Sequence, residues 1–132
     1  MPAIEFPYTF HKGYLMPIIP ITIQTHKVWV YVDSGATFSM VNAAEARDMG
    51  INWQNGRQQM VVVGDGSFIP VFIQDVPIEI GNTSINIPIG FSERLGVGFN
   101  LLGHTGVFSQ FEVCFNDHTR KVTFQPIRSA AV

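Results

Sequence analysis

The chain has 132 residues and a mass of 14.7 kDa, which fits one domain over residues 1–132 whose core needs neither disulfides nor metal. Its net charge of −2 and pI of about 6.0 exclude a basic surface for nucleic acid, and no apolar run reaches the roughly 18 residues of a membrane span. Charged residues make up only 14% of the chain, so we expect another subunit to cover part of the surface.

Cys114 is the only cysteine, which excludes an intrachain disulfide and suits a reducing compartment. Residues 1–10 lack the basic start and the long apolar stretch of a signal peptide. A cytoplasmic location is therefore the default expectation, although a domain released from an anchored precursor would carry the same features.

Two apolar segments are the first predicted elements. Tyr14–Thr25 contains Pro17 and Pro20, which predicts an edge strand or a bulged strand. Lys27–Val32 is rich in β-branched and aromatic residues, so we expect a buried strand that runs directly into a turn at residues 33–35.

The middle of the chain predicts a helix and then a long hairpin. Ser39–Met49 is the expected helix, capped by its first residue and stopped by Gly50. The hairpin spans Gln58–Gln74, and its turn contains the tight-turn signal Asp65-Gly66 between two apolar arms. The glycine of this pair is expected to need a positive φ.

The rest of the chain predicts a hairpin, a short helix and a final hairpin, over residues 76–89, 105–110 and 111–125. The aromatic side chains of this last part are expected in the core; they are Phe108, Phe111, Phe115 and Phe124. Many short strands, turn signals and two small helices together indicate a mostly β, barrel-like fold.

The most informative motif is Asp33-Ser34-Gly35-Ala36-Thr37, directly after the predicted strand. A carboxylate in that place is costly to ionise unless it is hydrogen-bonded or solvated. Gly35 lets the backbone turn tightly and donate N–H groups toward the carboxylate, and Ser34 adds a hydroxyl. The triplet alone does not define a site, because Asp-Ser-Gly is also ordinary β-turn chemistry.

The order of the segments carries more information than the triplet. The Asp33 loop is followed by the Gly-Asp-Gly hairpin and then by Asn100-Leu101-Leu102-Gly103. Over roughly residues 14–126 this order resembles the retropepsin-like aspartic proteases, most closely their bacterial members. The resemblance implies an acid-protease β-barrel with a flap hairpin and two short helices, working as a homodimer.

The resemblance also implies roles for individual residues. Asp33 matches the catalytic aspartate, and Ser34 matches the hydroxyl residue that grips across the dimer axis. The remaining matches are the substrate-contacting loop (Gly35, Ala36 and, next to it, Thr37), the flap tip (Gly64, Asp65, Gly66 and Ser67) and the segment packed beneath the loop (Leu101, Leu102 and Gly103). A flap differs from a static surface hairpin only in mobility, which sequence does not show.

The chain departs from the retroviral pattern at two positions. Retroviral members usually have an acid two residues after the loop glycine and an arginine after the downstream glycine, and these form an ion pair. Here the two positions hold Thr37 and His104. Because both charges are absent together, neither is left buried alone, and the dimer contacts near the loop are expected to differ.

Only one Asp-Ser/Thr-Gly triplet occurs in the chain. Aspartic protease chemistry needs two facing carboxylates that share one proton, because close like charges cannot both ionise cheaply. A homodimer with Asp33 at its two-fold axis supplies both. The sequence therefore predicts an aspartic endopeptidase that cleaves a peptide or protein substrate without cofactor or metal.

Alternatives from other classes remain at this stage. A dimer of the same fold could bind peptides without cutting them. Cys114 and His118, with His104 or His26, could hold a metal, but their spacing is not that of a known metal site. Gly64-x-Gly66 begins a dinucleotide-binding pattern, but the third glycine is absent and no βαβ unit follows.

Overall fold

The computed structural model describes residues 2–62, 65–95 and 100–127. The described residues are mostly β-strands, with one α-helix and one short 3₁₀ helix, as the sequence indicated for the fold class. The helices are α1 (Ala43–Asp48) and η1 (Trp53–Asn55). The strands are β1 (Ile4–Pro7), β2 (Thr9–His11), β3 (Tyr14–Met16), β4 (Ile18–Ile23), β5 (His26–Val32), β6 (Ser39–Asn42), β7 (Arg57–Val62), β8 (Phe68–Ile80), β9 (Thr83–Ser92), β10 (Asn100–Leu102), β11 (Phe111–Asn116) and β12 (Lys121–Pro126).

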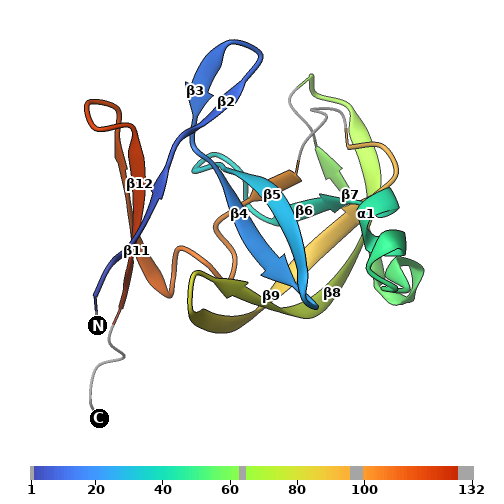
Figure 1. The fold of residues 1–132 in the computed structure, drawn as a ribbon. Coiled ribbons are helices and arrows are strands. Elements are labelled where there is room, and N and C mark those ends of the chain that lie inside the picture. Colours follow the sequence, from blue (N-terminus) through green and yellow to red (C-terminus); the bar gives the residue numbers. More distant parts are fainter. Residues whose placement is uncertain (1, 63–64, 96–99, 128–132) are drawn as a thin grey trace.

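A seven-stranded sheet forms the body of the molecule, in the order β4-β5-β10-β6-β9-β8-β7 (Figure 1). The first strand, β4, also pairs with β8 through Thr22 and Ile23, so the sheet closes on itself as a barrel. A three-stranded sheet, β1-β12-β11, brings the two ends of the chain together. β2 and β3 form a separate hairpin.

Strand β5 carries the chain to Asp33. Its residues alternate, with Val28, Val30 and Val32 buried and Trp29 exposed, so the strand that was expected to be buried is buried on one face. β10 runs parallel beside β5 and places Leu102 opposite Val32. Strands of the barrel that are remote in sequence therefore end together at the Asp33 turn.

The predicted helix over residues 39–49 begins four residues later than expected. Ser39–Asn42 is strand β6, and the cap is Asn42, whose side-chain oxygen accepts from the Ala44 N–H at 2.9 Å. Met40 packs into one hydrophobic cluster and Val41 into another. Only a strand turns successive side chains to opposite faces, so tertiary packing overrides the local capping signal of Ser39.

The second predicted helix, over residues 105–110, is a series of turns. Gly106 has a φ of +81°, which an α-helix does not accommodate. Hydrogen bonds from the Phe108 N–H to the His104 carbonyl and from the Phe111 N–H to the Val107 carbonyl form on either side of it. A Cβ on Gly106 would lie 3.0 Å from the Ile87 side chain, so both the positive φ and the lack of space favour glycine here.

Two further predictions need correction. The apolar segment 14–25 is split at Pro17 into β3 and β4, and only β4 joins the barrel. Phe115, expected in the core with the other phenylalanines of the tail, is 41% exposed near the end of β11. The hairpins predicted over residues 76–89 and 111–125 are confirmed.

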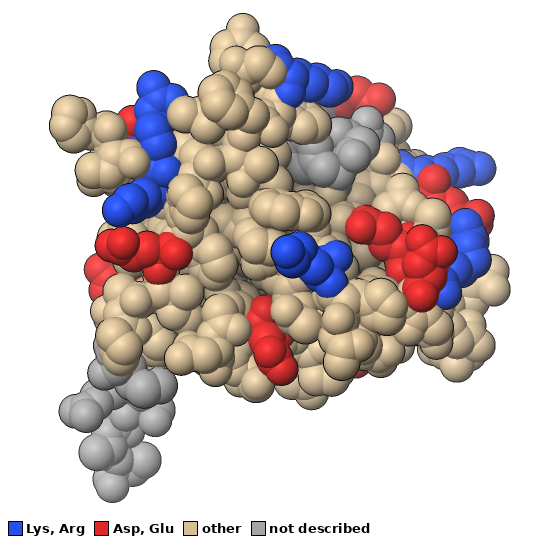
Figure 2. Space-filling model, viewed as in Figure 1, with Lys and Arg blue, Asp and Glu red and all other residues tan. Residues whose placement is uncertain are grey.

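Figure 1 shows three hairpins that point to the same side of the molecule, its upper side in that view. They are β2–β3, β7–β8 and β11–β12. The same view in space-filling form has broad uncharged areas between scattered charged side chains (Figure 2). Among the residues described, no helix is both long and apolar enough to cross a membrane.

Asn100 ties the start of β10 to the helix. It is 3% exposed, its side-chain oxygen accepts from the Asn42 N–H at 2.8 Å, and its amide donates to the Trp29 carbonyl at 3.1 Å and to the Glu45 carboxylate. Each of the three partners loses its hydrogen bond when the Asn100 side chain is removed, and a buried polar group without a partner lowers the stability of the fold.

We therefore expect Asn100→Ala to lower the free energy of unfolding by about 2–4 kcal/mol, measured by urea denaturation. The control is Asn86→Ala, because Asn86 is exposed on β9 and its loss should cost less than about 0.5 kcal/mol. Equal stabilities of the two variants would contradict this role of Asn100.

Candidate active site

Asp33 stands at the end of β5, half buried, in a turn that its own carboxylate helps to shape. The Gly35 N–H donates to Asp33 Oδ1 at 2.8 Å, and the Ala36 N–H donates to the Asp33 carbonyl at 3.2 Å. A Cβ on Gly35 would lie 3.3 Å from the same Oδ1. The loop thus fixes one carboxylate oxygen against the backbone and leaves the other available.

The segment beneath the loop holds it by backbone hydrogen bonds. The Asp33 N–H donates to the Leu102 carbonyl at 3.0 Å. The His104 N–H donates to the Ala36 carbonyl at 2.9 Å, and both the N–H and the hydroxyl of Thr105 donate to the Thr37 carbonyl, at 2.9 and 2.8 Å. Residues 102–105, called the clamp below, therefore hold the whole turn in place by hydrogen bonds.

Gly103 is required where the loop and this clamp cross. A Cβ there would lie 2.5 Å from the Phe38 carbonyl oxygen and 2.7 Å from that of Ala36, far inside contact distance. Its N–H donates to the Ser39 hydroxyl at 3.0 Å, which explains why a serine is buried in strand β6. Leu102 is fully buried in the main core, and Leu101 packs on a second cluster.

His104 occupies the position of the missing retroviral arginine. Its Nε2 lies 2.5 Å from the Ser34 carbonyl oxygen, so the hydrogen bond requires the proton on Nε2. The imidazole also stacks on the Phe108 ring, with centroids 4.3 Å apart and 20° between the planes. A side chain from the clamp thus reaches the loop residue next to Asp33, although the charged pair of other members is absent.

The predicted flap is the β7–β8 hairpin. Gly64 lies outside the described residues, while Gly66 has a φ of +84°, so the expected positive φ is confirmed. Asp65 Oδ1 accepts from the N–H and the hydroxyl of Ser67, and these bonds lower the pKa of Asp65. Asp65, Gly66 and Ser67 are all exposed, and none of them contacts the Asp33 loop through a hydrogen bond that the described residues show.

The base of this hairpin is tied to the loop region by packing. Ile69, Val71 and Ile73 of β8 share a hydrophobic cluster with Met40, and half-buried Leu101 packs against it. The opposite face of the hairpin is apolar yet open, with Met60, Val62 and Phe68 54%, 58% and 62% exposed. A hairpin fixed at its base with an exposed apolar end suits a cover over a neighbouring site.

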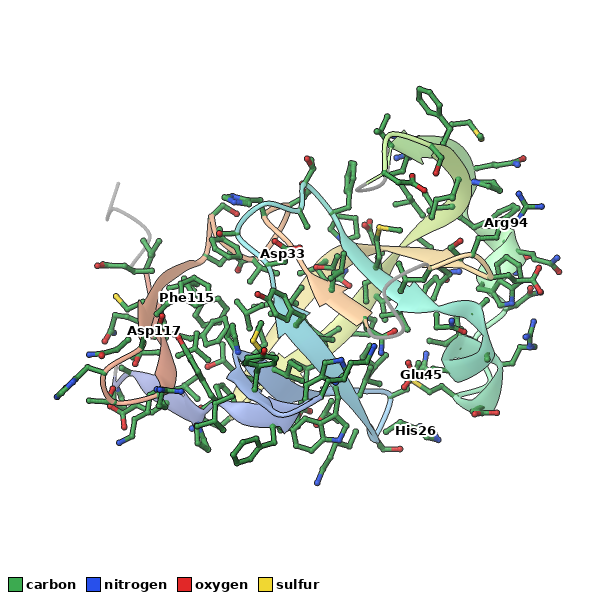
Figure 3. The ribbon with its side chains drawn as sticks, turned by 90° about the horizontal axis from the view of Figure 1, so that it is seen from above. His26, Asp33, Glu45, Arg94, Phe115 and Asp117 are labelled. Atoms are coloured by element: carbon green, nitrogen blue, oxygen red, sulfur yellow. The ribbon has the colours of Figure 1, made fainter. Side chains whose placement is uncertain are left out.

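A pocket of about 450 Å³ opens beside Asp33. Its lining includes Tyr31, Val32, Asp33 and Ser34, and the rest comes from the β2–β3 and β11–β12 hairpins and from Tyr8 and Pro17, which flank β2–β3. Figure 3 looks onto this side of the molecule and shows Phe115 and Asp117 on one side of Asp33. The loop therefore faces a cavity of the size that binds ligands.

Two tyrosines of the pocket have raised pKa values. Burial, and then the hydrogen bond and charge of Asp117, raise the pKa of Tyr8 to about 12. Burial, and then the charges of Asp33 and Asp117, raise the pKa of Tyr31. Both phenols therefore stay protonated near neutral pH and remain hydrogen-bond donors.

The suggested metal ligands do not gather. Cys114 is exposed on β11, and in the described part of the chain no three His, Cys, Asp or Glu side chains are placed to hold a metal ion. His104 instead contacts the Asp33 loop, and His26 contacts the Gln24 carbonyl.

The fold and the site together define the retropepsin-like class. Its features here are a closed β-barrel, an Asp-Ser-Gly turn held by a downstream segment, and a hairpin of flap type. A family model described as aspartyl protease matches residues 19–105. The chain belongs to this aspartyl protease family.

The solved structures agree about the fold. A retropepsin-like aspartic protease from Rickettsia conorii superposes with a TM-score of 0.71 at 15% identity, over 93% of this chain and 98% of that one. The EIAV protease complexed with the inhibitor HBY-793 gives a TM-score of 0.54 at 18% identity, over 72% and 88% of the two chains. No curated protein sequence matched.

Sequence reasoning missed most of the pocket. Tyr31 could have been predicted as a pocket residue, because it lies two residues before Asp33 and strand periodicity puts both side chains on one face. Tyr8 and Asp117 had no local signal: they are 109 positions apart and meet through a 2.8 Å hydrogen bond that only the folded chain creates.

The tight crossing at Gly103 gives a prediction of its own. Gly103→Ala should lower the free energy of unfolding by about 2–4 kcal/mol, because its methyl group meets two fixed carbonyl oxygens. Gly90→Ala is the matched control, since a Cβ there makes an ordinary 3.5 Å contact with Val71 and should change stability by less than about 1 kcal/mol. Thermal and urea unfolding measure both; a Gly103→Ala protein as stable as Gly90→Ala would refute the crossing argument.

Proposed function

We propose that this chain is an aspartic endopeptidase that works as a homodimer, with Asp33 of each subunit forming the catalytic pair. The observation that carries the proposal is the Asp33 turn: one carboxylate at the end of a barrel strand, clamped by residues 102–105 and open to a pocket. The aspartyl protease family and the retropepsin-like fold support peptidase chemistry in general.

The proposed mechanism uses one water and no covalent intermediate. In the pair, one carboxylate is ionised and takes a proton from the water, while the other is protonated and polarises the scissile carbonyl. The Gly35 N–H would hold each Asp33 in place as the charge moves. Substrate would lie extended beneath the two flaps and be held by main-chain hydrogen bonds.

The homodimer follows from the number of carboxylates. Asp33 heads the only Asp-Ser-Gly triplet, and one such loop supplies half of the pair. Ser34 is exposed beside it, and the role that we propose for it is contact with the partner loop across the axis. The exposed apolar end of the β7–β8 hairpin would be covered in part by the partner or the substrate.

The decisive experiment is cleavage of a peptide library by the wild-type protein and by Asp33→Asn. The substitution is nearly isosteric, so fold and dimer should persist while the rate falls by roughly 10⁴-fold or more, because the pair can no longer share a proton. A transition-state-mimicking inhibitor of aspartic proteases should stop wild-type cleavage. Peptide binding without cleavage would favour a non-catalytic peptide-binding dimer.

Mixed dimers test the shared site in the same assay. When wild type and Asp33→Asn are refolded together in equal amounts, random pairing leaves about a quarter of the dimers wild type, and activity per total chain should fall to that level. A site complete within one chain would instead keep half of the activity, which would contradict the homodimer.

His104 gives a second prediction. His104→Phe keeps a ring to stack on Phe108 and removes the donor to the Ser34 carbonyl, so kcat/KM should fall by roughly tenfold or more because the loop is less well positioned. His104→Gln offers an amide donor and should restore part of the loss. Thermal unfolding of both variants separates this effect from instability; His104→Phe with wild-type kcat/KM would show that the contact does not position the loop.

A further inference from the structure

We propose that the pocket beside Asp33 is the principal side-chain subsite of this peptidase, and that it accepts a long basic side chain, lysine or arginine, whose charged end binds to Asp117. The proposal rests on the peptidase function proposed above and names its preferred substrate.

The position of the pocket fits the side chain next to the scissile bond. Asp33 and Ser34 form part of its lining, so a peptide bond held at Asp33 places a neighbouring side chain at its opening. Its volume of about 450 Å³ lies within the range of small-ligand sites, which is enough for the longest side chains.

The walls suit a methylene stem. The lining includes Leu15 and Met16 from β3, Pro17 directly after it, and Phe115 from β11. Lysine and arginine bury their aliphatic stems against such surfaces and extend the charged end beyond them. The exposure of Phe115, which was unexpected from sequence, is explained by this position.

Asp117 provides the acceptor for the charged end. The hydroxyl of Tyr8 donates to Asp117 Oδ1 at 2.8 Å and so fixes the carboxylate at the pocket wall. A carboxylate accepts up to about four hydrogen bonds, so Oδ2 and the remaining lone pair are available to a substrate. Because the pKa of Tyr8 is raised to about 12, the phenol keeps its donor proton at any pH at which a peptidase works.

The charges favour a cation over an anion. Two acidic residues, Asp33 and Asp117, line the pocket, whereas its lining includes a single basic residue, Arg120. The negative charges of both carboxylates contribute to the raised pKa of Tyr31, so both act on the same part of the pocket. No ion pair joins Arg120 to Asp117 within the described residues, so the carboxylate is not neutralised by a close partner. A lysine or arginine end would complete that pairing.

Most of this pocket comes from outside the common family core. The family model matches residues 19–105, whereas Tyr8, Met16, Phe115 and Asp117 lie before or after that range. The Asp33 turn thus lies within the matched region, while most of the subsite comes from the two hairpins on either side of that region in the sequence.

The test starts from a peptide that the wild type cleaves at a known bond. Variants of this peptide carry lysine, norleucine or glutamate on either side of that bond. For wild type, kcat/KM for lysine should exceed that for norleucine by roughly tenfold at one of the two positions, with glutamate the worst. Asp117→Asn should bring kcat/KM for the lysine and norleucine peptides to similar values, and Asp117→Lys should favour glutamate.

Asp48→Asn is the matched control, since Asp48 is an exposed carboxylate at the end of α1 and its change should leave the ratios intact. Three results for Asp117→Asn would overturn the subsite. The first is unchanged ratios of kcat/KM, and the second is loss of cleavage of every peptide, which would place Asp117 in the chemistry itself. The third is dissociation of the dimer in sedimentation, which would place the partner subunit in the pocket.

Binding to the Asp33→Asn protein separates this proposal from the peptidase function. Calorimetry should give tighter binding of the lysine peptide than of the norleucine peptide, and the difference should vanish when Asp117→Asn is added. If wild type cleaves nothing but this difference is present, the peptidase function fails and the subsite stands as a binding pocket. If the two peptides bind equally, the subsite is wrong whatever the activity.

Discussion

The crossing of the Asp33 loop with residues 102–105 is the contact on which the rest of the site depends. Carbonyl groups at positions 34, 36 and 37 all accept hydrogen bonds from residues 104 and 105, and the Asp33 N–H donates back to Leu102. The crossing is so close that only Gly103 fits. A residue at the end of a strand could otherwise adopt several orientations. Here hydrogen bonds hold the backbone of Asp33 itself and of the loop residues that follow it.

The same crossing organises the core. Leu102 beneath the loop belongs to the main core, and Leu101 joins the cluster under the β7–β8 hairpin. Loop, clamp and flap base are therefore parts of one packed unit, and interiors at native density transmit small displacements. His104 adds a polar contact where retroviral members have an ion pair, which allows a chain with few charges to hold the same turn.

Two hairpins surround this common centre. The hairpins β2–β3 and β11–β12 lie outside the matched family region, point to the side of the Asp33 turn and wall the pocket (Figures 1 and 3). The hydrogen bond from Tyr8 to Asp117 links the beginning of the chain to its end at that wall. The pocket wall thus combines the Asp33 turn with residues from both ends of the chain.

The amino-acid sequence was enough to predict the strands with strong alternation, the tight turns at Asp-Gly and Gly-Asn, and the Asp33 motif with its downstream Leu-Leu-Gly, because these signals are local or fixed by their order. The predicted first helix began too early, since Ser39 is a good cap by local chemistry but is buried as the acceptor for Gly103. A helix through Gly106 and a buried Phe115 were also predicted wrongly. These features and the pocket depend on tertiary contacts, because the meeting of residues as distant as Tyr8 and Asp117 depends on how the barrel closes and leaves no periodicity in the chain.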